Sequence, residues 1–523
     1  MNYGIYSQNT WLFPDSVAAD GKKDIALTLL KGQTGAFQVV LEGITEGKAI
    51  QWIAQNLDGV KVDVYRERDV CVNRNSADEI HISLTTDQWE DIKDYRVRKA
   101  PYRTYDALVP AVNLVSKGEK EAYYVSLCPN DDAEAGVRNG EIVFTIGDDA
   151  VSVPVTLKVG KKALPPQTLK IANWCDEGNM ATHHGLEIGS REHKEMIQKY
   201  YDLLKECHNN VYRVSLNHIK GEYKDNKIIY NLQPAIEEAE FALKNGAEIL
   251  EWGCILIRGD WEELPMVLYD PRSKSHINCF SDWGRKCLKA YLTQLDELLT
   301  ERGWKDISLM HICDEPKERC ASDYRIVAGI FRKYLPGVKL MDAVEIYFLQ
   351  DALDIYVPKP HYYIQHRKAF ESLRDDRNEL WFYTCNMPTG RWLSRFLDSP
   401  LLNTRLLHWC NYRFNMGGYL HWGFNRPVRG ADPFEETSDN SWLPAGDSHI
   451  VYPGDGEPLR SARFMQMKCG VEDYEILKAV SKINKRYADE LCYKVTFSFD
   501  RYITDVDEFD ALHNALVEYY DSL

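Results

Sequence analysis

The chain has 523 residues, of which 44% are apolar, so it is long enough to bury more than one large core. Its 63 basic and 79 acidic residues give a net charge of -16. No dense basic run offsets this charge, which excludes an obvious surface for nucleic acid or an anionic membrane. The 13 cysteines lack CxxC spacing, which predicts reduced thiols rather than a disulfide framework or a structural zinc site.

The sequence contains no membrane-spanning signal, because no stretch approaches the roughly 18 apolar residues that a spanning helix needs. The first twenty residues also lack the basic and apolar regions of a signal peptide. We therefore expect a cytoplasmic protein without membrane insertion, or a secreted one if a signal peptide has been removed.

Residues 1–162 predict an antiparallel β-sandwich. Short segments there alternate apolar and polar residues between turn signals, as in the run that contains Val151, Val153, Val155, Leu157 and Val159. This period of two is typical of half-buried strands. The cluster Lys161–Pro166 (KKALPP) then indicates a linker.

Residues 167–488 predict a (β/α)8 TIM barrel, which makes the whole chain a multidomain β plus α/β protein. Short apolar strands alternate with longer segments of helical spacing, of which Trp283–Arg302 is the clearest helix. Eight strands, the number in a closed barrel, are expected near Leu169–Trp174, Val211–Leu216, Glu248–Leu256, Ile307–Cys313, Val338–Val344, Leu353–Val357, Leu380–Thr384 and Gly418–Phe424.

The end of the chain predicts a long helix and a packing segment. The helix, roughly Ser461–Lys485, is expected to close the barrel. Residues 489–523 then contain an alternating run at Tyr493–Phe499 and an amphipathic run at Asp505–Tyr520. We expect this tail to pack on the domains rather than to carry chemistry.

The run His311–Pro316 (HICDEP) carries the functional prediction. It places Asp314 and Glu315 at the carboxyl end of the fourth expected strand, where α/β barrels keep their catalytic groups. An acidic pair before proline can also merely cap a loop or pair with Lys317 and Arg319. In a barrel, however, Glu315 is well placed as a general acid/base.

A second catalytic carboxylate is not apparent. Many retaining glycosidases need two carboxyl groups about 5 Å apart. Here the seventh expected strand ends in Tyr383–Met387 without an acid, and Glu379 lies at its opposite end. The missing nucleophile favours substrate assistance, in which a 2-acetamido group attacks its own anomeric carbon. Asp314 would then stabilise the oxazolinium cation while Glu315 transfers protons.

The chain resembles glycoside hydrolase family 123, whose members are N-acetyl-β-galactosaminidases, and the wider group of family 123-like catalytic domains. The motifs that carry this resemblance are Gly32–Leu41 (GQTGAFQVVL), Tyr105–Pro110 (YDALVP), HICDEP, Gly418–Asn425 (GYLHWGFN) and Cys469–Leu477 (CGVEDYEIL). It implies a β-sandwich followed by a (β/α)8 barrel. It also implies that Asp314 stabilises the acetamido group, that Glu315 is the acid/base, and that no metal or organic cofactor takes part.

Two departures from the family pattern bear on specificity. Lys468–Cys469 stands where related chains commonly have Glu-Gly, and the tryptophan-rich eighth-strand segment contains His421 and Arg426. Both changes can alter which sugar is accepted.

Further candidates for substrate binding lie at the ends of the other expected strands. Trp174 closes the first strand, Asn217 and His218 the second, Tyr383 the seventh, and Trp422 with Asn425 the eighth. For each tryptophan, ordinary core packing is about as good an explanation as stacking on a sugar. Trp442 and Asp447 belong to the long segment Arg426–Glu457, which we expect to form a pocket wall.

Metal catalysis is a weaker reading of the sequence. His183 and His184 follow Asp176 and could combine with His218, but HxH and HExxH spacings are absent. Three scattered histidines are more often ordinary polar residues, so we predict no metal site.

The leading prediction is a retaining exo-glycosidase that removes terminal β-linked N-acetylgalactosamine from a glycan or glycoconjugate. One alternative is a glycosidase for another sugar that takes its second acid from Asp432, Glu435 or Asp447. Another is a carbohydrate-binding protein without catalysis, although binding alone does not require adjacent acids. The sequence does not fix the role of the sandwich or the oligomeric state.

Overall fold

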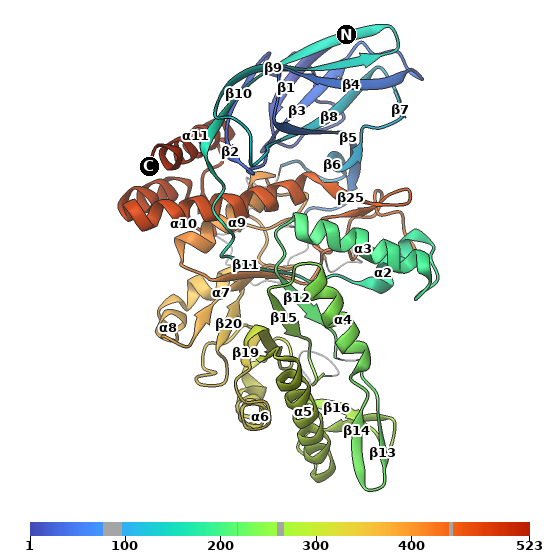
Figure 1. The fold of residues 1–523 in the computed structure, drawn as a ribbon, viewed down its shortest axis with the longest axis vertical. Coiled ribbons are helices and arrows are strands. Elements are labelled where there is room, and N and C mark those ends of the chain that lie inside the picture. Colours follow the sequence, from blue (N-terminus) through green and yellow to red (C-terminus); the bar gives the residue numbers. More distant parts are fainter. Residues whose placement is uncertain (77–96, 217, 259–265, 439–442) are drawn as a thin grey trace.

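The computed structural model describes residues 1–76, 97–216, 218–258, 266–438 and 443–523 (Figure 1). Two predicted binding residues, Asn217 and Trp442, lie outside the described residues. Within these ranges, no helix is both long and apolar enough to cross a membrane.

The amino-terminal region contains two β-sheets. The larger has the spatial order β1 (Asn2–Ser7), β3 (Gly35–Glu42), β8 (Lys120–Pro129), β5 (Val60–Val72), β6 (Tyr102–Pro110), β25 (Pro458–Ser461) and β24 (Tyr452–Pro453). The smaller has the order β2 (Ile25–Lys31), β10 (Asp149–Ala163), β9 (Gly136–Ile146), β4 (Ala49–Gln55) and β7 (Leu114–Val115). A shared apolar core, which includes Phe37 and Leu157, contains residues from both sheets.

One pair in the smaller sheet departs from the expected antiparallel order. β2 and β10 are parallel, whereas β10 and β9 are antiparallel. Parallel neighbours need a long crossover, and here the chain builds most of the larger sheet between the two strands. Alternation of apolar residues gives no direction to a strand, so the sequence pattern did not reveal this pair.

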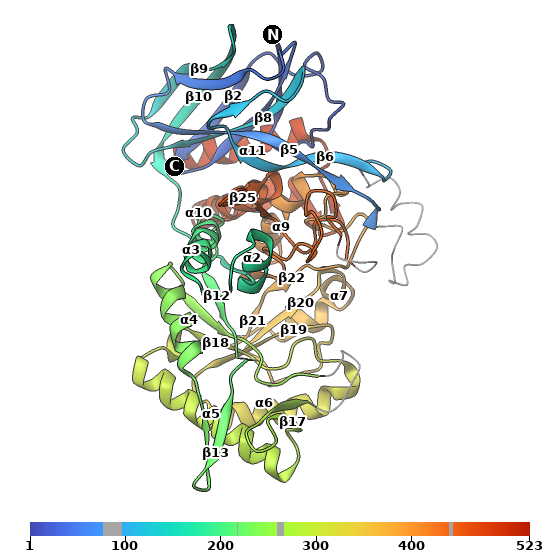
Figure 2. The ribbon, with the colours of Figure 1, turned by 90° about the vertical axis from the view of Figure 1, so that its right-hand side faces the viewer.

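Segments from the end of the chain join the amino-terminal sheets. β25 pairs antiparallel with β6, where Arg460 lies opposite Leu108. The last helix, α11 (Val506–Ser522), contacts β2 and β10, and Figures 1 and 2 show it beside these strands. The tail therefore packs on the sandwich, as the sequence predicts, through a helix with Phe509, Leu516 and Val517 buried.

The second region is built on parallel strands at the eight expected positions. One sheet has the order β12 (Val211–Val214), β15 (Ile249–Trp252), β18 (Ser308–His311), β19 (Lys339–Val344), β20 (Ile355–Pro358) and β21 (Glu379–Leu380). The other has the order β11 (Lys170–Asn173), β23 (Gly418–His421) and β22 (Phe382–Tyr383). Every recorded pair within both sheets is parallel.

The two sheets adjoin at two places where no strand pairing joins them, between β21 and β22 and between β11 and β12. Only Trp381 separates β21 from β22. At the other junction, the Asn210 backbone N–H donates to the Ile171 carbonyl over 3.2 Å, and the Asn210 side-chain oxygen accepts from the Ile171 N–H at 2.9 Å. These observations are compatible with a closed barrel, whose closure stays a prediction.

Helices separate and cover the parallel strands (Figures 1 and 2). They are α2 (Glu177–His184), α3 (Arg191–Glu206), α4 (Gln233–Lys244), α5 (Asp282–Arg302), α6 (Ala321–Tyr334), α7 (Pro360–Gln365), α8 (Arg367–Ser372), α9 (Leu402–Arg413) and α10 (Ala462–Val495). α5 begins after the Ser281 cap and ends at Gly303, whose φ of 68° suits glycine, so its predicted range is nearly that observed. Short hairpins pair β13 (Gly221–Lys224) with β14 (Lys227–Tyr230), and β16 (Val267–Asp270) with β17 (Ser275–Asn278).

α10 is longer than the sequence predicts. Asn484 interrupts it with φ -137° and ψ 78°, yet a helix continues to Val495. Leu491, Cys492 and Val495 are buried on one face of this extension, so tertiary packing outweighs the alternating pattern of the run Tyr493–Phe499. Within that run only Thr496–Ser498 forms a strand, β26, which pairs with β27 (Arg501–Tyr502).

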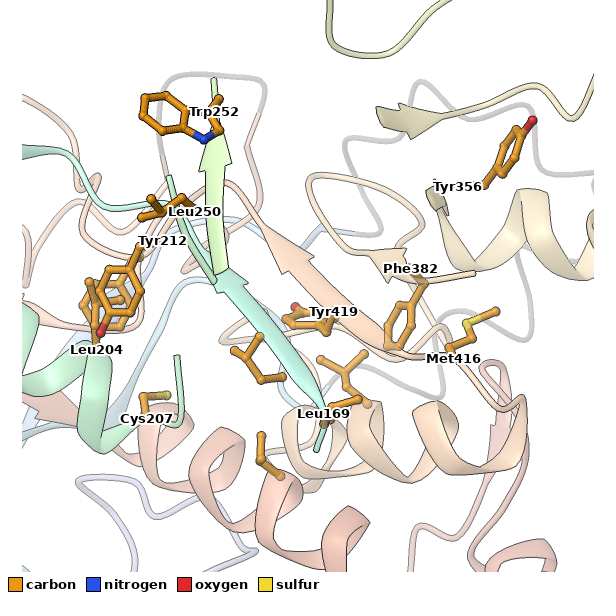
Figure 3. Packing of buried hydrophobic residues seen from close by; sticks show 14 of the residues in the cluster. Leu169, Leu204, Cys207, Tyr212, Leu250, Trp252, Tyr356, Phe382, Met416 and Tyr419 are labelled. Carbon is orange, nitrogen blue, oxygen red and sulfur yellow. The ribbon is translucent and has the colours of Figure 1, made fainter. Parts of the chain in front are cut away.

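The parallel strands bury residues on both faces. Outward residues pack with the helices, and Figure 3 shows Tyr212 beside Leu204, and Tyr419 near Phe382, in this outer core. A separate inner core contains residues from seven of the eight strand positions, namely Ala172, Val211, Leu309, Met341, Ala343, Ile355, Val357, Trp381, Tyr383 and Leu420. Ile249 of β15, the eighth position, is partly buried and packs against this core. Burial on both faces explains why the strands read as short, nearly continuous apolar runs.

Candidate active site

Asp314 and Glu315 occupy a strained turn directly after β18. Their φ values are 43° and 44°, in the left-handed region that residues with side chains rarely adopt. The Arg258 guanidinium donates hydrogen bonds to the backbone carbonyls of both residues, with 2.7 Å to that of Glu315. Two consecutive residues held in this conformation motivate a functional assignment, because strain of this kind concentrates at active sites.

A buried histidine lies beneath Asp314. His311 Nε2 is 3.5 Å from an Asp314 oxygen and 3.0 Å from an Asp342 oxygen, while its Nδ1 is 3.0 Å from a Glu251 oxygen. The side chains of His311, Asp342 and Glu251 are fully buried, whereas that of Asp314 is 37% exposed. Asp314 is thus the member of this group that substrate can reach.

The electrostatics of this group favour an imidazolium and an ionised Asp314. Burial favours a neutral His311 ring, but the neighbouring Asp342 and Asp314 carboxylates hold the pKa of His311 well above its usual range. Burial also opposes ionisation of Asp314, but the hydrogen bond and charge of His311 hold the pKa of Asp314 below its usual value. Asp314 is therefore a fixed negative charge at neutral pH.

Further hydrogen bonds fix the His311 ring at both ends. On one side, Glu251 accepts a hydrogen bond from Trp174 Nε1 at 3.0 Å. On the other, Asp342 accepts from the Tyr324 hydroxyl at 2.6 Å and from the Cys313 backbone N–H at 3.2 Å. We call Trp174, Glu251, His311, Asp342 and Tyr324 the histidine chain.

Glu315 has a different set of partners. One of its carboxylate oxygens accepts a hydrogen bond from Tyr383 and lies 3.2 Å from Lys359 Nζ. Lys359 also lies 2.9 Å from Glu345, which is paired with Lys317. Burial favours a neutral amine, yet these carboxylates hold the pKa of Lys359 above its usual value. Glu315 therefore faces an ammonium group that has a second acceptor.

Two of the predicted binding residues thus contact the candidate acids or their partners. Tyr383 bonds to Glu315, and Trp174 bonds to Glu251 rather than presenting a free ring edge. One face of Trp174 is covered by Arg213, whose guanidinium carbon is 3.8 Å from the ring centroid. Trp174 and Tyr383 belong to the inner core, and Trp422 packs against it.

The other predicted residues have more varied surroundings. Trp422 Nε1 donates to Asp447 at 3.2 Å, and burial raises the pKa of Asp447 to about 7. Asn425 bonds to the backbone of Asp176 over 2.7 and 3.0 Å, so it joins the segments after β11 and β23. His218 is exposed, and within the described part of the chain no hydrogen bond or ion pair links it to Asp314 or Glu315.

The sequence reading missed several charged residues of the site. Glu251 and Asp342 lie within expected strands, and Lys359 directly follows another. A charged residue in a buried apolar strand needs a partner, and this signal could have marked all three. Their pairing with His311 or Glu315 depended on which strands become neighbours.

A cluster with metal-ligand potential overlaps the histidine chain. His311, Asp314 and Asp342 offer atoms within 4.8 Å of one another, a donor set suited to a divalent cation. The raised pKa of His311 favours a proton instead, because a metal would need the deprotonated ring. His183 and His184 have separate partners, the Pro427 carbonyl at 3.3 Å and the Tyr200 hydroxyl at 3.1 Å.

The loop acids considered as alternative nucleophiles lie in different places. Glu435 pairs with Arg103 of β6 at 2.7 Å, and Asp432 accepts from the Phe434 backbone N–H at 2.9 Å. Asp447 is fully buried. Glu435 is thereby directed to the amino-terminal sheet rather than to Asp314.

Comparison with known families decides the relationship. The family model "Glycoside hydrolase 123, catalytic domain" matches residues 174–480, which include Asp314 and Glu315. The chain belongs to glycoside hydrolase family 123. Membership in family 123 supports a glycosidase that acts on glycan substrates, in agreement with the resemblance seen in the sequence.

Solved structures include one with the same overall fold. A family 123 glycoside hydrolase from Clostridium perfringens, studied for glycolipid glycan hydrolysis, is 13% identical with a TM-score of 0.76. The match covers 100% of this chain and 97% of that chain. An Ig-like-domain-containing GH10 xylanase from termite gut is 11% identical, with a TM-score of 0.35 over 87% of this chain and 100% of its own, too low to inform the family 123 fold. No curated protein matches the sequence.

Proposed function

We propose that this family 123 protein is a retaining exo-glycosidase that removes terminal β-linked N-acetylgalactosamine by substrate-assisted catalysis. The observation that carries the proposal is the adjacent pair with unlike partners. Asp314 is held against the His311 imidazolium, and Glu315 lies against Tyr383 and Lys359. This arrangement suits one permanently charged carboxylate and one proton carrier.

We also propose that the two parallel sheets form one closed (β/α)8 barrel. Two observations support closure. All eight strand positions contribute residues to the inner core or to the packing against it, and hydrogen bonds of Asn210 join β11 to the start of β12. Asp314, Lys359 and Tyr383 lie at or beyond the carboxyl ends of their strands, the end where barrels place catalytic groups.

In the first step, Asp314 orients the acetamido N–H of the bound sugar. The acetamido oxygen then bonds to the anomeric carbon while the glycosidic carbon–oxygen bond breaks. Glu315 donates its proton to the departing oxygen, and the Asp314 carboxylate balances the positive oxazolinium. Lys359 can remain with Glu345 while Glu315 carries a proton, because Glu345 is its nearer acceptor, 2.9 Å against 3.2 Å.

In the second step, Glu315 removes a proton from water as the water oxygen bonds to the anomeric carbon. The bond between that carbon and the acetamido oxygen breaks, so the amide is restored with overall retention of configuration. All covalent changes involve sugar and water. The proposed reaction therefore needs no metal or organic cofactor. As a separate point, we propose that the protein works in the cytoplasm.

The test is hydrolysis of matched aryl β-glycosides of N-acetylgalactosamine, N-acetylglucosamine, galactose and glucose. We expect turnover confined to the acetamido sugars and fastest for N-acetylgalactosamine. Glu315→Gln should lower kcat by about a thousandfold for phenyl glycosides, consistent with loss of general acid/base catalysis. Glu301→Gln on the exposed surface of α5 is the matched control and should retain activity.

Two results would overturn parts of the proposal. Full activity of Glu315→Gln on a phenyl glycoside would exclude Glu315 as the acid/base. Comparable turnover of galactosides or glucosides would require a protein nucleophile, and Asp447 would then be the first loop acid to replace because it bonds to Trp422.

A further inference from the structure

Arginines lie beside two of the three tryptophans that the sequence marks as candidates for sugar binding, Trp174 and Trp422. Arg213 lies 3.8 Å above the Trp174 ring, and Arg426 lies 5.8 Å from the Trp422 ring centroid. A guanidinium stacked on an aromatic ring keeps its N–H edge available for an anion. The site wall near β11, β12 and β23 is therefore cationic as well as aromatic.

These guanidinium groups have unused hydrogen-bonding capacity. Arg213 shares β12 with Val211, an inner-core residue, and both lie on the same face of the strand. Arg213 Nε and Arg426 Nε are shielded from water and have no hydrogen-bond partner among the described residues. These two Nε atoms are closed to a ligand as well as to water, but the Arg426 side chain is 40% exposed, so its terminal N–H groups can reach acceptors that a ligand supplies.

The nearby acids offset only part of this positive charge. Arg426 and Arg429 share Asp176, at 3.2 and 3.8 Å. Asp176 also accepts the capping hydrogen bond from the Asn179 N–H at 2.8 Å. Asp314 contributes a negative charge near Arg213, but that carboxylate already faces His311. Arg426 and Arg429 thus share one acid that is not part of the catalytic pair, and Arg213 lies beside the buried Glu251 in the strand register.

The positions of Arg213 and Arg426 indicate which hydroxyl groups of the bound sugar these arginines would face. In the proposed reaction, C2 of the sugar lies at Asp314 and the anomeric carbon at Glu315. Glu315 contacts residues of β20 and β22, so the aglycone leaves on that side. The hydroxyls at C3, C4 and C6 then lie toward β11, β12 and β23, where Arg213 and Arg426 are located.

We propose that Arg213 and Arg426, with Arg429 at the rim, bind a tetrahedral oxyanion ester, sulfate or phosphate, on the terminal N-acetylhexosamine. This inference rests on the proposed function and narrows its substrate to an anionic sugar. An ester substituent fits an exo-acting enzyme, because the sugar remains terminal. Arginine forks match the oxygens of such esters in a bidentate way.

The test compares kcat/KM for 4-nitrophenyl N-acetyl-β-galactosaminide with its 3-, 4- and 6-sulfates and its 6-phosphate. At least one ester should be preferred by about tenfold or more, as expected for charge-assisted hydrogen bonds. Arg213→Gln and Arg426→Gln should each lower that preference by about tenfold, and salt should weaken it. Comparing sulfate with phosphate at one position identifies the ester.

Arg191→Gln is the matched control, because this arginine is 86% exposed on α3 and pairs with Glu195 within the same helix. It should leave both the preference and the activity unchanged. If Arg213→Gln fails to fold, Arg429→Gln replaces it, since that side chain is 63% exposed, and it should still reduce the preference.

The outcomes separate this inference from the proposed function. Turnover of the unsubstituted sugar with every ester equal or slower overturns the ester site alone. A preference for an ester that survives both Arg213→Gln and Arg426→Gln also overturns it. If no acetamido glycoside is hydrolysed, the proposed function fails, and calorimetry with the free sulfated and phosphorylated sugars decides the site. Binding no tighter than that of N-acetylgalactosamine would then overturn it.

Discussion

The two sides of the catalytic pair differ although Asp314 and Glu315 are neighbours in the chain. The Asp314 side contains the histidine chain, a buried imidazolium locked between carboxylates. The Glu315 side contains the Lys359 ammonium, which also reaches Glu345. A fixed partner suits a charge that must persist through the reaction, whereas a partner with an alternative acceptor suits a group that gains and loses a proton.

Among the changes considered, replacing the fixed negative charge of Asp314 should have the largest effect on kcat. Asp314→Asn should lower kcat for N-acetylgalactosaminides by about a hundred- to a thousandfold, because it removes the charge that stabilises the oxazolinium. Steady-state kinetics would measure this loss, and Asp306→Asn, at an exposed position, serves as control. An unchanged kcat would end the assignment of Asp314 as the stabilising group.

Removal of the imidazolium should change the pH profile as well as the rate. Without His311, burial acts on Asp314 unopposed, so the pKa of Asp314 rises and protonation disables it at higher pH. His311→Gln should therefore lower kcat/KM by about ten- to a hundredfold and shift its acidic limb upward. A profile parallel to that of the wild type would show that His311 acts only through packing.

The loss of rate on replacing Lys359 should depend on the leaving group of the substrate. Lys359→Met leaves Glu315 and Glu345 without their shared cation and should slow phenyl glycosides by about tenfold, with a smaller loss for dinitrophenyl glycosides that need less protonation. Lys359→Arg should restore part of the rate. Equal losses for both leaving groups would argue against a link between Lys359 and proton transfer.

A pair of tyrosines offers the smallest and most direct comparison. Tyr383 bonds to Glu315 itself, whereas Tyr324 reaches Asp314 only through Asp342 and His311. Tyr324→Phe should cost about threefold in kcat/KM, near the value of one hydrogen bond, and Tyr383→Phe more. A larger effect from Tyr324 would mean that the histidine chain limits the rate more than the partners of Glu315 do.

Local patterns in the sequence were sufficient for the strand positions and for selecting Asp314 and Glu315 as candidates, because apolar runs ending in acids depend only on nearby residues. The catalytic roles of these two acids stay predictions. The same local patterns were insufficient to predict which side chains contact these two acids. Lys359 meets both Glu315 and Glu345 because β18, β19 and β20 are neighbours, which no local pattern states. The direction of β2 and the pairing of β25 with β6 were missed for the same reason.

The strand β25 ties the catalytic region to the amino-terminal sheets. Directly after it, Arg463 pairs with Asp106 of β6 at 2.9 Å and donates to the Gly446 carbonyl at 2.6 Å, one residue before Asp447. Asp106 also accepts from the Tyr452 hydroxyl at 2.7 Å. The larger sheet thus holds one wall of the site in place. A chain without residues 1–162 would lose these contacts to the site along with its first domain.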